Sequence, residues 1–169
     1  MANKRRRTTN RKESGSFVIV PHELLLSDTY IPLSSKAVKC LFDMYVEYKG
    51  SNNGDLSCTF KLMQKRGWTS KSHLDNAKNE LLEKGLIVLT RQGGRNKCNL
   101  YAITWQPIDE CKGKLDRKEM SMALGYWKQG FNPELRSIKN KLKPVPQIQG
   151  QRTPNTGLVT PINNIAAAH

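Results

Sequence analysis

GDLSCTFKLMQKRGWTSKSHLDNAKNELLEKGLIVLTRQGGRNKCNLYAITW, residues 54–105, is the stretch that decides the fold of this 169-residue chain. It begins with a short apolar-patterned segment that ends at a Gly67-Trp68 turn. A strongly periodic segment follows, in which apolar residues recur at three- and four-residue steps, as on one side of a helix. Two β-branched and aromatic runs then flank a turn with two glycines at residues 93–97, which is the pattern of a β-hairpin.

The helices of this stretch have recognisable ends. Ser70 is a good N-cap, because its hydroxyl can accept a hydrogen bond from an early backbone amide of the helix after it. Gly85 closes that helix, as expected for a left-handed terminal residue. One side of the helix should carry Leu74, Ala77, Lys78, Leu81 and Leu82. A shorter helix over residues 59–66 should bury Phe60, Leu62 and Met63.

Weaker patterns flank this stretch. Residues 17–20 are typical of a short strand, and Pro21 should begin a brief helical turn. Ser34 or Ser35 can cap a helix that continues until Gly50. Beyond Trp105, residues 115–128 have helical composition, and Asn132-Pro133-Glu134 can start one more short helix.

Positive charge dominates the composition, with 28 Lys and Arg against 14 Asp and Glu and a formal net charge of +14. This excess is the usual electrostatic footprint of a nucleic-acid partner, although a solvated basic surface would have the same composition. Residues 1–16 have six basic and one acidic residue, residues 17–105 twelve and eight, and residues 106–169 ten and five. Both flanks are therefore denser in positive charge than the middle, and we expect flexible arms to add attraction to phosphates.

The sequence favours neither metal nor catalytic chemistry. Cys40, Cys58, Cys98 and Cys111 include no Cys-x-x-Cys pair, so we expect reduced structural thiols, with no metal site and no cofactor. Neither a phosphate-cradling glycine loop nor a catalytic triad pattern is visible, so the chain is not expected to be an enzyme. Residues 17–20 are too short for a secretory core or a membrane span, which predicts a cytoplasmic, nucleoid-associated protein without a membrane partner.

The segment over about residues 33–105 resembles the winged helix-turn-helix family. The matching positions are Leu62, Met63, Gly67, Ser70, Leu74, Ala77, Leu81 and the residues 84–87 that precede the hairpin. The resemblance implies an α+β fold with a three-helix core and a β-hairpin wing, as in phage or plasmid replication proteins and small bacterial regulators. It also implies double-stranded DNA as the partner, with the third helix in the major groove and the wing on the backbone or minor groove.

Carried over by position, the resemblance assigns DNA contacts to the outward side of the third helix, namely Lys71, Ser72, His73, Asn76 and Asn79. Asn76 is the best candidate for base readout, because an amide can both donate to and accept from the major-groove edge of adenine. Lys71 is more suited to phosphate near the positive end of the helix. Further contacts are expected from the wing and the basic arm, through Arg95, Lys97, Arg5, Arg6 and Arg7. An ordinary solvated polar helix face is the alternative interpretation.

Other residues limit this interface. The helix also has three acidic residues, which do not suit a surface that faces phosphates: Asp75, Glu80 and Glu83. We therefore expect only the first two turns of the helix to contact bases. Trp68, Tyr101 and Trp105 are expected to pack in the core rather than to stack on bases.

The expected organisation is a disordered basic arm at 1–15, the winged domain at 16–106, a linker with short amphipathic helices at 107–143 and a disordered Pro/Gly/Gln tail at 144–169. Two roles fit this layout: a transcription regulator, or a protein of phage or plasmid DNA replication or partition. An apolar stripe of Leu135, Ile138 and Leu142 could dock on a replication or transcription protein, support a homodimer or have no partner. A non-specific nucleic-acid-binding or nucleoid-type structural protein is the remaining alternative.

Overall fold

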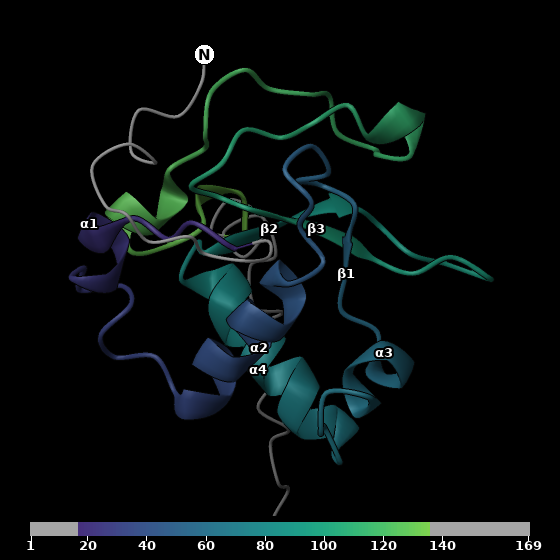
Figure 1. The fold of residues 1–169 in the computed structure, drawn as a ribbon, viewed down its shortest axis with the longest axis horizontal. Coiled ribbons are helices and arrows are strands. Elements are labelled where there is room, and N and C mark those ends of the chain that lie inside the picture. The colour runs from purple at the N-terminus through teal and green to yellow at the C-terminus, as the bar shows by residue number, and fades with distance from the viewer. Residues whose placement is uncertain (1–16, 136–169) are drawn as a thin grey trace, which may run out of the picture.

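The computed structural model describes residues 17–135, which form a mixed α+β fold (Figure 1). Its sheet has three antiparallel strands in the order β1-β3-β2. The helices lie on one side of this sheet, and the segment after β3 crosses the other side. In chain order the elements are α1 (His22–Leu25), α2 (Ser35–Tyr45), β1 (Leu56–Ser57), α3 (Phe60–Gln64), α4 (Lys71–Glu83), β2 (Ile87–Arg91), β3 (Leu100–Ile103), and the 3-10 turns η2 (Cys111–Gly113) and η3 (Tyr126–Gln129).

Hydroxyl caps begin the three longer helices, as the sequence predicts for α2 and α4. The side chains of Ser34, Thr59 and Ser70 accept hydrogen bonds from backbone amides in the first turns of α2, α3 and α4. At the other end of α4, Gly85 has a φ of +72°, and a Cβ there would lie 2.9 Å from the carbonyl oxygen of Phe131. Only glycine fits this position, which explains why α4 ends here.

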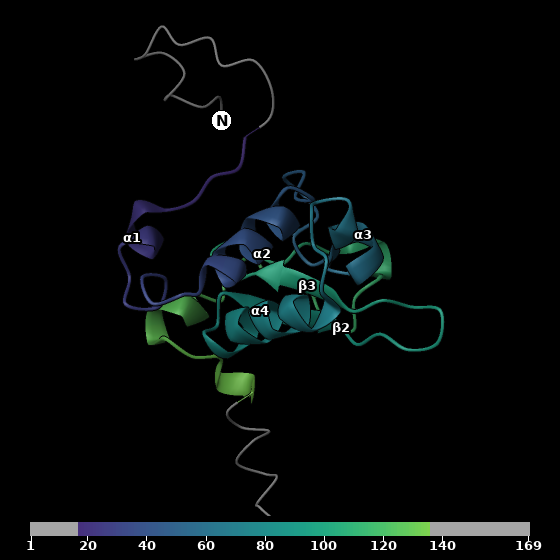
Figure 2. The same ribbon diagram turned by 90° about the horizontal axis from the view of Figure 1, so that it is seen from below.

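The main core lies between α2, α4 and the inner face of the sheet. Helices α2 and α4 pack side by side, which both ribbon views show (Figures 1 and 2). Fully buried side chains of this core include Leu41, Met44, Leu74, Leu81, Ile87 and Ile103. The expectation that Trp68, Tyr101 and Trp105 pack in the core is confirmed, because all three are buried.

The hairpin of β2 and β3 forms as predicted, but its turn differs. The strands end at Arg91 and resume at Leu100, and an isolated bridge joins Gly94 to Lys97 around a tight turn at residues 95 and 96. Close packing at the root of the loop requires glycine, since a Cβ on Gly93 would lie 2.7 Å from the backbone nitrogen of Asn99. The result is a long, narrow loop that projects away from the body of the molecule (Figure 2).

The predicted strand over residues 17–20 is not formed. This segment has no regular secondary structure and belongs to no sheet. Its backbone oxygen at Ile19 instead accepts hydrogen bonds from the Tyr45 hydroxyl at 2.8 Å and from Trp105 Nε1 at 3.4 Å. Two side-chain donors of the core therefore hold this segment in place, instead of the backbone hydrogen bonds that a strand would make with a neighbouring strand.

The predicted helix over residues 115–128 is also wrong. The structure has the two short 3-10 turns η2 and η3 with irregular chain between them. Leu115 and Leu124 pack beside Ile108 on Val88 and Ala102, which lie on the outer face of the sheet. Gly125, with a φ of +61°, breaks the helical path and donates its N–H to the Thr104 carbonyl at 2.8 Å. The apolar residues Leu115 and Leu124 therefore cover the outer face of the sheet from irregular chain and not from a helix.

Residues 107–135 are thus part of the folded unit and not a linker; we call them the strap. The end of the strap returns to the helices. There the backbone N–H of Asn132 donates to the Glu83 carbonyl at 3.0 Å, and Trp127 is buried in the main core. The predicted cap at Asn132 is confirmed, since its side chain accepts from the Glu134 amide and residues 133–135 are helical. None of the helices within residues 17–135 is long and apolar enough to cross a membrane.

Candidate nucleic-acid interface

The exposed side of α4 carries the polar residues that the sequence places there. All five are exposed: Lys71, Ser72, His73, Asn76 and Asn79. The other side of the helix is buried through Leu74, Ala77 and Leu81. The predicted orientation of the helix is therefore confirmed, and the contact of this face with DNA stays a prediction. We call these five residues the α4 face.

The hairpin loop supplies a second exposed basic element. Arg95 and Lys97 are exposed at its tip, as expected. At the root of the loop, Arg91 Nη2 donates to the Cys98 carbonyl at 3.1 Å, and Asn99 accepts a hydrogen bond from the Gly93 amide. These bonds tie the two arms of the loop together, so the tip extends from an ordered base.

A pocket of about 190 Å³ lies between the start of α4 and the root of the hairpin. Its lining includes Thr59 and Phe60 from the start of α3, Lys71 and Lys78 from α4, and Asn99 beside the hairpin. The first turn of α4 and the hairpin root therefore border one hollow. A single elongated polyanion could span this hollow and contact both elements.

The acidic residues of α4 have partners within the protein. Asp75 forms an ion pair with Lys78, whose Nζ lies 2.8 Å from Oδ1. Burial is the largest single influence on Lys78 and disfavours its charged ammonium, but the hydrogen bond with Asp75 and the nearby Tyr101, Asp75 and Cys58 groups together outweigh burial and leave the pKa of Lys78 raised. Glu80 accepts hydrogen bonds from the Ser34 backbone nitrogen at 2.8 Å and from the Ser34 hydroxyl at 2.6 Å. Glu80 thus adds negative charge at the positive end of α2 and ties α4 to it.

The corner between α3 and α4 is held by Trp68. Its Nε1 donates to Asp43 Oδ2 at 2.7 Å, and the Lys39 ammonium lies 5.6 Å from the centre of the indole ring. Lys39 also pairs with Asp43 and donates to the Arg66 carbonyl at 2.9 Å. One carboxylate on α2 therefore fixes both the indole and a cation at this corner, which sets the angle at which α4 leaves α3.

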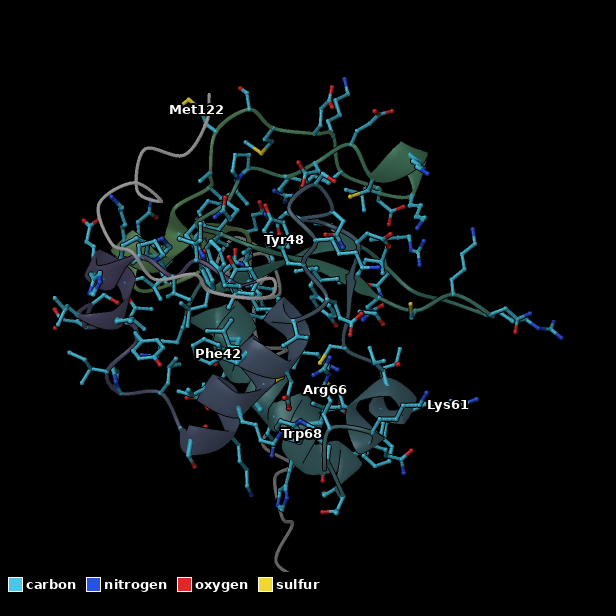
Figure 3. The ribbon with its side chains drawn as sticks, in the orientation of Figure 1. Phe42, Tyr48, Lys61, Arg66, Trp68 and Met122 are labelled. Carbon is cyan, nitrogen blue, oxygen red and sulfur yellow. The ribbon has the colours of Figure 1, made fainter. Side chains whose placement is uncertain are left out.

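Two basic residues, Lys61 on α3 and Lys65 directly after it, were missed as site candidates. Lys61 and Lys65 are exposed, and Lys61 points away from the body on the side to which the hairpin projects (Figure 3). The sequence pattern could have indicated both lysines. If Phe60, Leu62 and Met63 face the core, Lys61 between them and Lys65 after them should face outward. Like Lys71, Arg95 and Lys97, these two lysines are exposed cations.

Several of the expected contacts lie outside the described residues. Arg5, Arg6 and Arg7 of the basic arm fall there, as do Ile138 and Leu142 of the proposed partner stripe. Leu135, the remaining member of that stripe, is half-buried and is the last residue of the strap.

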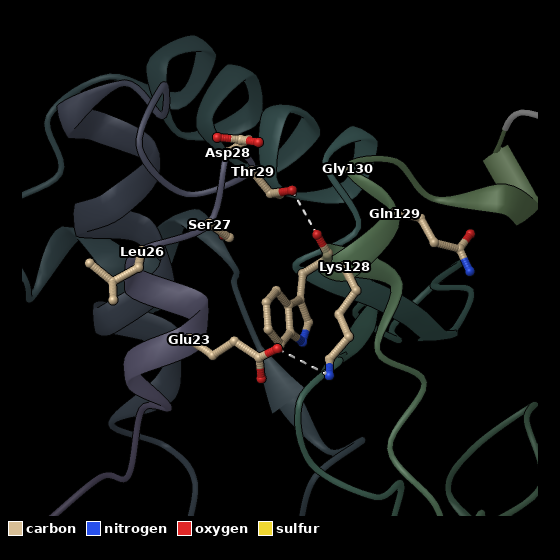
Figure 4. Close-up of a pocket in the computed structure, with 9 residues that line it drawn as sticks. Glu23, Leu26, Ser27, Asp28, Thr29, Lys128, Gln129 and Gly130 are labelled. Atoms are coloured by element: carbon tan, nitrogen blue, oxygen red, sulfur yellow. Dashed lines mark hydrogen bonds and ion pairs between the residues drawn. The ribbon is translucent and has the colours of Figure 1, made fainter.

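A second hollow, of about 560 Å³, lies at the end of the molecule near α1 and η3, away from the hairpin (Figure 4). Its lining includes Glu23, Asp28, Trp127 and Lys128. Thr29 donates its hydroxyl to the Trp127 carbonyl at 2.6 Å, and Lys128 lies 3.5 Å from Glu23. These contacts join the strap to α1. Over residues 17–135, no group of three His, Cys, Asp or Glu side chains is placed to hold a metal ion.

Comparisons with protein-family models, with curated protein sequences and with solved structures found no significant match to this chain.

Proposed function

We propose that this protein binds double-stranded DNA in a sequence-specific manner through a winged helix-turn-helix. The order of α2, β1, α3, α4 and the β2–β3 hairpin fits that arrangement, with α4 as the helix in the major groove and the hairpin as the wing. The observation that carries the proposal is the exposed α4 face beside a projecting basic hairpin. The strongly positive net charge supports it independently.

The proposed division of labour follows from the chemistry of each side chain. Asn76 reads a base, because its amide can match the donor and acceptor of an adenine in the major groove. Lys61, Lys71 and the wing residues neutralise phosphates and position the helix, which gives affinity without sequence information. Glu83 and Lys84 lie about 20 Å along α4 from Lys71, given the rise of a helix, and remain outside the contact.

The role of DNA binding is either regulation of transcription or replication of a phage or plasmid. Fragments selected by the protein from host and mobile-element DNA distinguish the two, since a regulator selects promoters and a replication protein selects an origin. Equal binding of the selected fragments and of random duplex would instead favour the non-specific, nucleoid-type alternative.

The test of base readout is the substitution Asn76→Ala on the selected site, with affinity measured by fluorescence anisotropy. We expect a loss of about 1–3 kcal/mol on that site and little change on random duplex, so that preference at one base pair is relaxed. An equal loss on both duplexes, or no loss on either, would contradict the assignment of Asn76.

The test of phosphate contact compares two lysines of the same helix. Lys71→Ala should weaken binding to every duplex and reduce the slope of log affinity against log salt by about 1. Lys84→Ala removes the same charge at the other end of α4 and should leave that slope unchanged. Lys61→Ala should resemble Lys71→Ala. If the two α4 variants behave alike, the N-terminal half of α4 does not face the duplex.

A further inference from the structure

Two cysteines meet in the core between α2 and β1. Cys40 lies on α2 and Cys58 directly follows β1, and their sulfur atoms are 3.7 Å apart. Both residues are free thiols, and their exposed fractions are 0% and 4%. A disulfide needs a sulfur separation of about 2.05 Å, so the pair is within about 2 Å of bonding.

Cys58 is open to small molecules although little of it is exposed. It lines the pocket of about 190 Å³ between the start of α4 and the hairpin root, together with Lys71 and Lys78. Hydrogen peroxide is close to water in size and can enter such a pocket. Cys40 does not line the pocket and lies behind Cys58, so an oxidant that enters reaches Cys58 first.

The surroundings of the pair give its two thiols different roles. The hydrogen bond with Cys40 and the nearby Lys78 ammonium hold the pKa of Cys58 below its usual range, despite burial. The same hydrogen bond and burial raise the pKa of Cys40. The thiolate is the reactive form, and a thiolate on Cys58 lies on the sulfur that lines the pocket, where an incoming oxidant meets it first.

We propose that Cys58 is a peroxide-reactive thiol, that Cys40 is its resolving partner, and that the disulfide between them weakens DNA binding. The last part rests on the proposed function, whereas the chemistry of the pair does not.

The reaction consumes one peroxide and yields two waters. The Cys58 thiolate attacks one peroxide oxygen, the O–O bond breaks, and hydroxide leaves to give a sulfenic acid on Cys58. The Cys40 sulfur then attacks the Cys58 sulfur, the S–S bond forms and the S–O bond breaks. The departing oxygen takes the proton of Cys40 and leaves as water, and the first hydroxide takes up the proton that Cys58 had released. Two thiols are oxidised to a disulfide and the peroxide is reduced.

The link to DNA binding is the position of Cys58. The next residue, Thr59, caps α3 through its hydroxyl, and Phe60 lines the same pocket. Closing the sulfur gap in a close-packed core must move the start of α3 relative to α2. That movement changes the pocket between α4 and the hairpin, across which the duplex is proposed to lie. We expect the oxidised protein to bind DNA at least about tenfold more weakly, in line with the sensitivity of binding to small displacements.

The experiment treats the full-length protein with hydrogen peroxide, alkylates the remaining thiols and maps the peptides by mass spectrometry. We expect two alkylatable thiols in place of four, a mass lower by about 2 Da before alkylation, and a cross-linked peptide that contains Cys40 and Cys58. A dithiol reductant should restore all four thiols. In Cys40→Ser, dimedone should trap the sulfenic acid on Cys58.

The matched control is Cys98→Ser with Cys111→Ser, which leaves the pair intact and should respond like the parent protein. Cys98 lines the same pocket, but its sulfur lies near the Ser57 hydroxyl and the Arg91 guanidinium, each at 3.8 Å, rather than near another thiol. Thermal melts by circular dichroism verify that each variant is folded. Four reactive thiols after peroxide, or a disulfide that involves Cys98 or Cys111, would overturn the proposal.

DNA affinity is then measured for the reduced and oxidised protein on the same duplex. A disulfide at Cys40 and Cys58 that leaves affinity unchanged overturns the switch. Absence of DNA binding in the reduced protein refutes the proposed function instead, and in that case the peptide map still decides whether Cys58 and Cys40 react as a pair.

Discussion

Asn53 is the most connected polar residue in the core, and its replacement by alanine should strongly destabilise the protein. Its side chain is fully buried. The amide nitrogen lies 2.7–3.1 Å from the carbonyl oxygens of Ile103, Gln106 and Pro107, and the amide oxygen accepts from the Ile103 backbone nitrogen at 2.8 Å. These bonds join the loop before β1 to the end of β3 and to the beginning of the strap.

The magnitude follows from the number of bonds. An amide nitrogen has two hydrogens, so Asn53 makes at most two well-aligned donor bonds to the three carbonyls, and it makes one acceptor bond. Three hydrogen bonds at about 1 kcal/mol each, plus about 1–3 kcal/mol for a buried Ile103 N–H without its acceptor, give a loss of about 4–6 kcal/mol. The free energy of unfolding of a domain is about 5–15 kcal/mol, so Asn53→Ala should remove a large part of the stability of the protein.

Urea unfolding followed by tryptophan fluorescence measures this loss, because Trp68, Trp105 and Trp127 are all buried in the folded protein. Asn52→Ala is the matched control. Asn52 is only partly buried, and its two hydrogen bonds, with Lys49 and Glu47, lie within the same loop. It should lose no more than about 2 kcal/mol, because no buried core group is left without its partner. Equal unfolding free energies for the two variants would refute the reasoning that Asn53 joins the strap to the sheet.

Two further predictions concern charge. Deletion of residues 1–15 should weaken binding to all duplexes and flatten its salt dependence, because the basic arm is expected to contact phosphates; an unchanged salt slope would show that the arm is not on the backbone. Burial raises the pKa of Tyr101 above 10.0, so the stability it contributes is present below about pH 10 and is lost as the pH rises through the folded-state pKa. Unfolding free energies measured from pH 8 to 11 should therefore fall less steeply in Tyr101→Phe than in the parent protein.

Local signals in the sequence predicted the helices and the hairpin, and these signals also determine which residues of α4 form the exposed α4 face. A hydroxyl at Ser70, glycine at Gly85 and apolar steps of three and four residues act within one or two turns of chain, so they can be recognised without knowledge of the rest of the molecule. The same periodicity separated the buried Leu74 and Leu81 from the exposed Asn76. The position of the candidate site on α4 was therefore predictable, and so was the presence of a basic hairpin, whereas the length of its projecting loop was not.

Only the tertiary structure decided how the remaining segments are used. The apolar residues Leu115 and Leu124 were assigned to a helix, yet the outer face of the sheet needed a cover, and burial of that face outweighed a weak helical preference. Likewise, nothing near Asn53, Cys40 or Cys58 in the sequence indicates their partners, which lie between 18 and 54 residues away. The physical reason is common to these cases: a capped helix is specified by neighbours along the chain, whereas a shared hydrogen bond, a thiol contact or a covered sheet face exists only after distant segments have packed together.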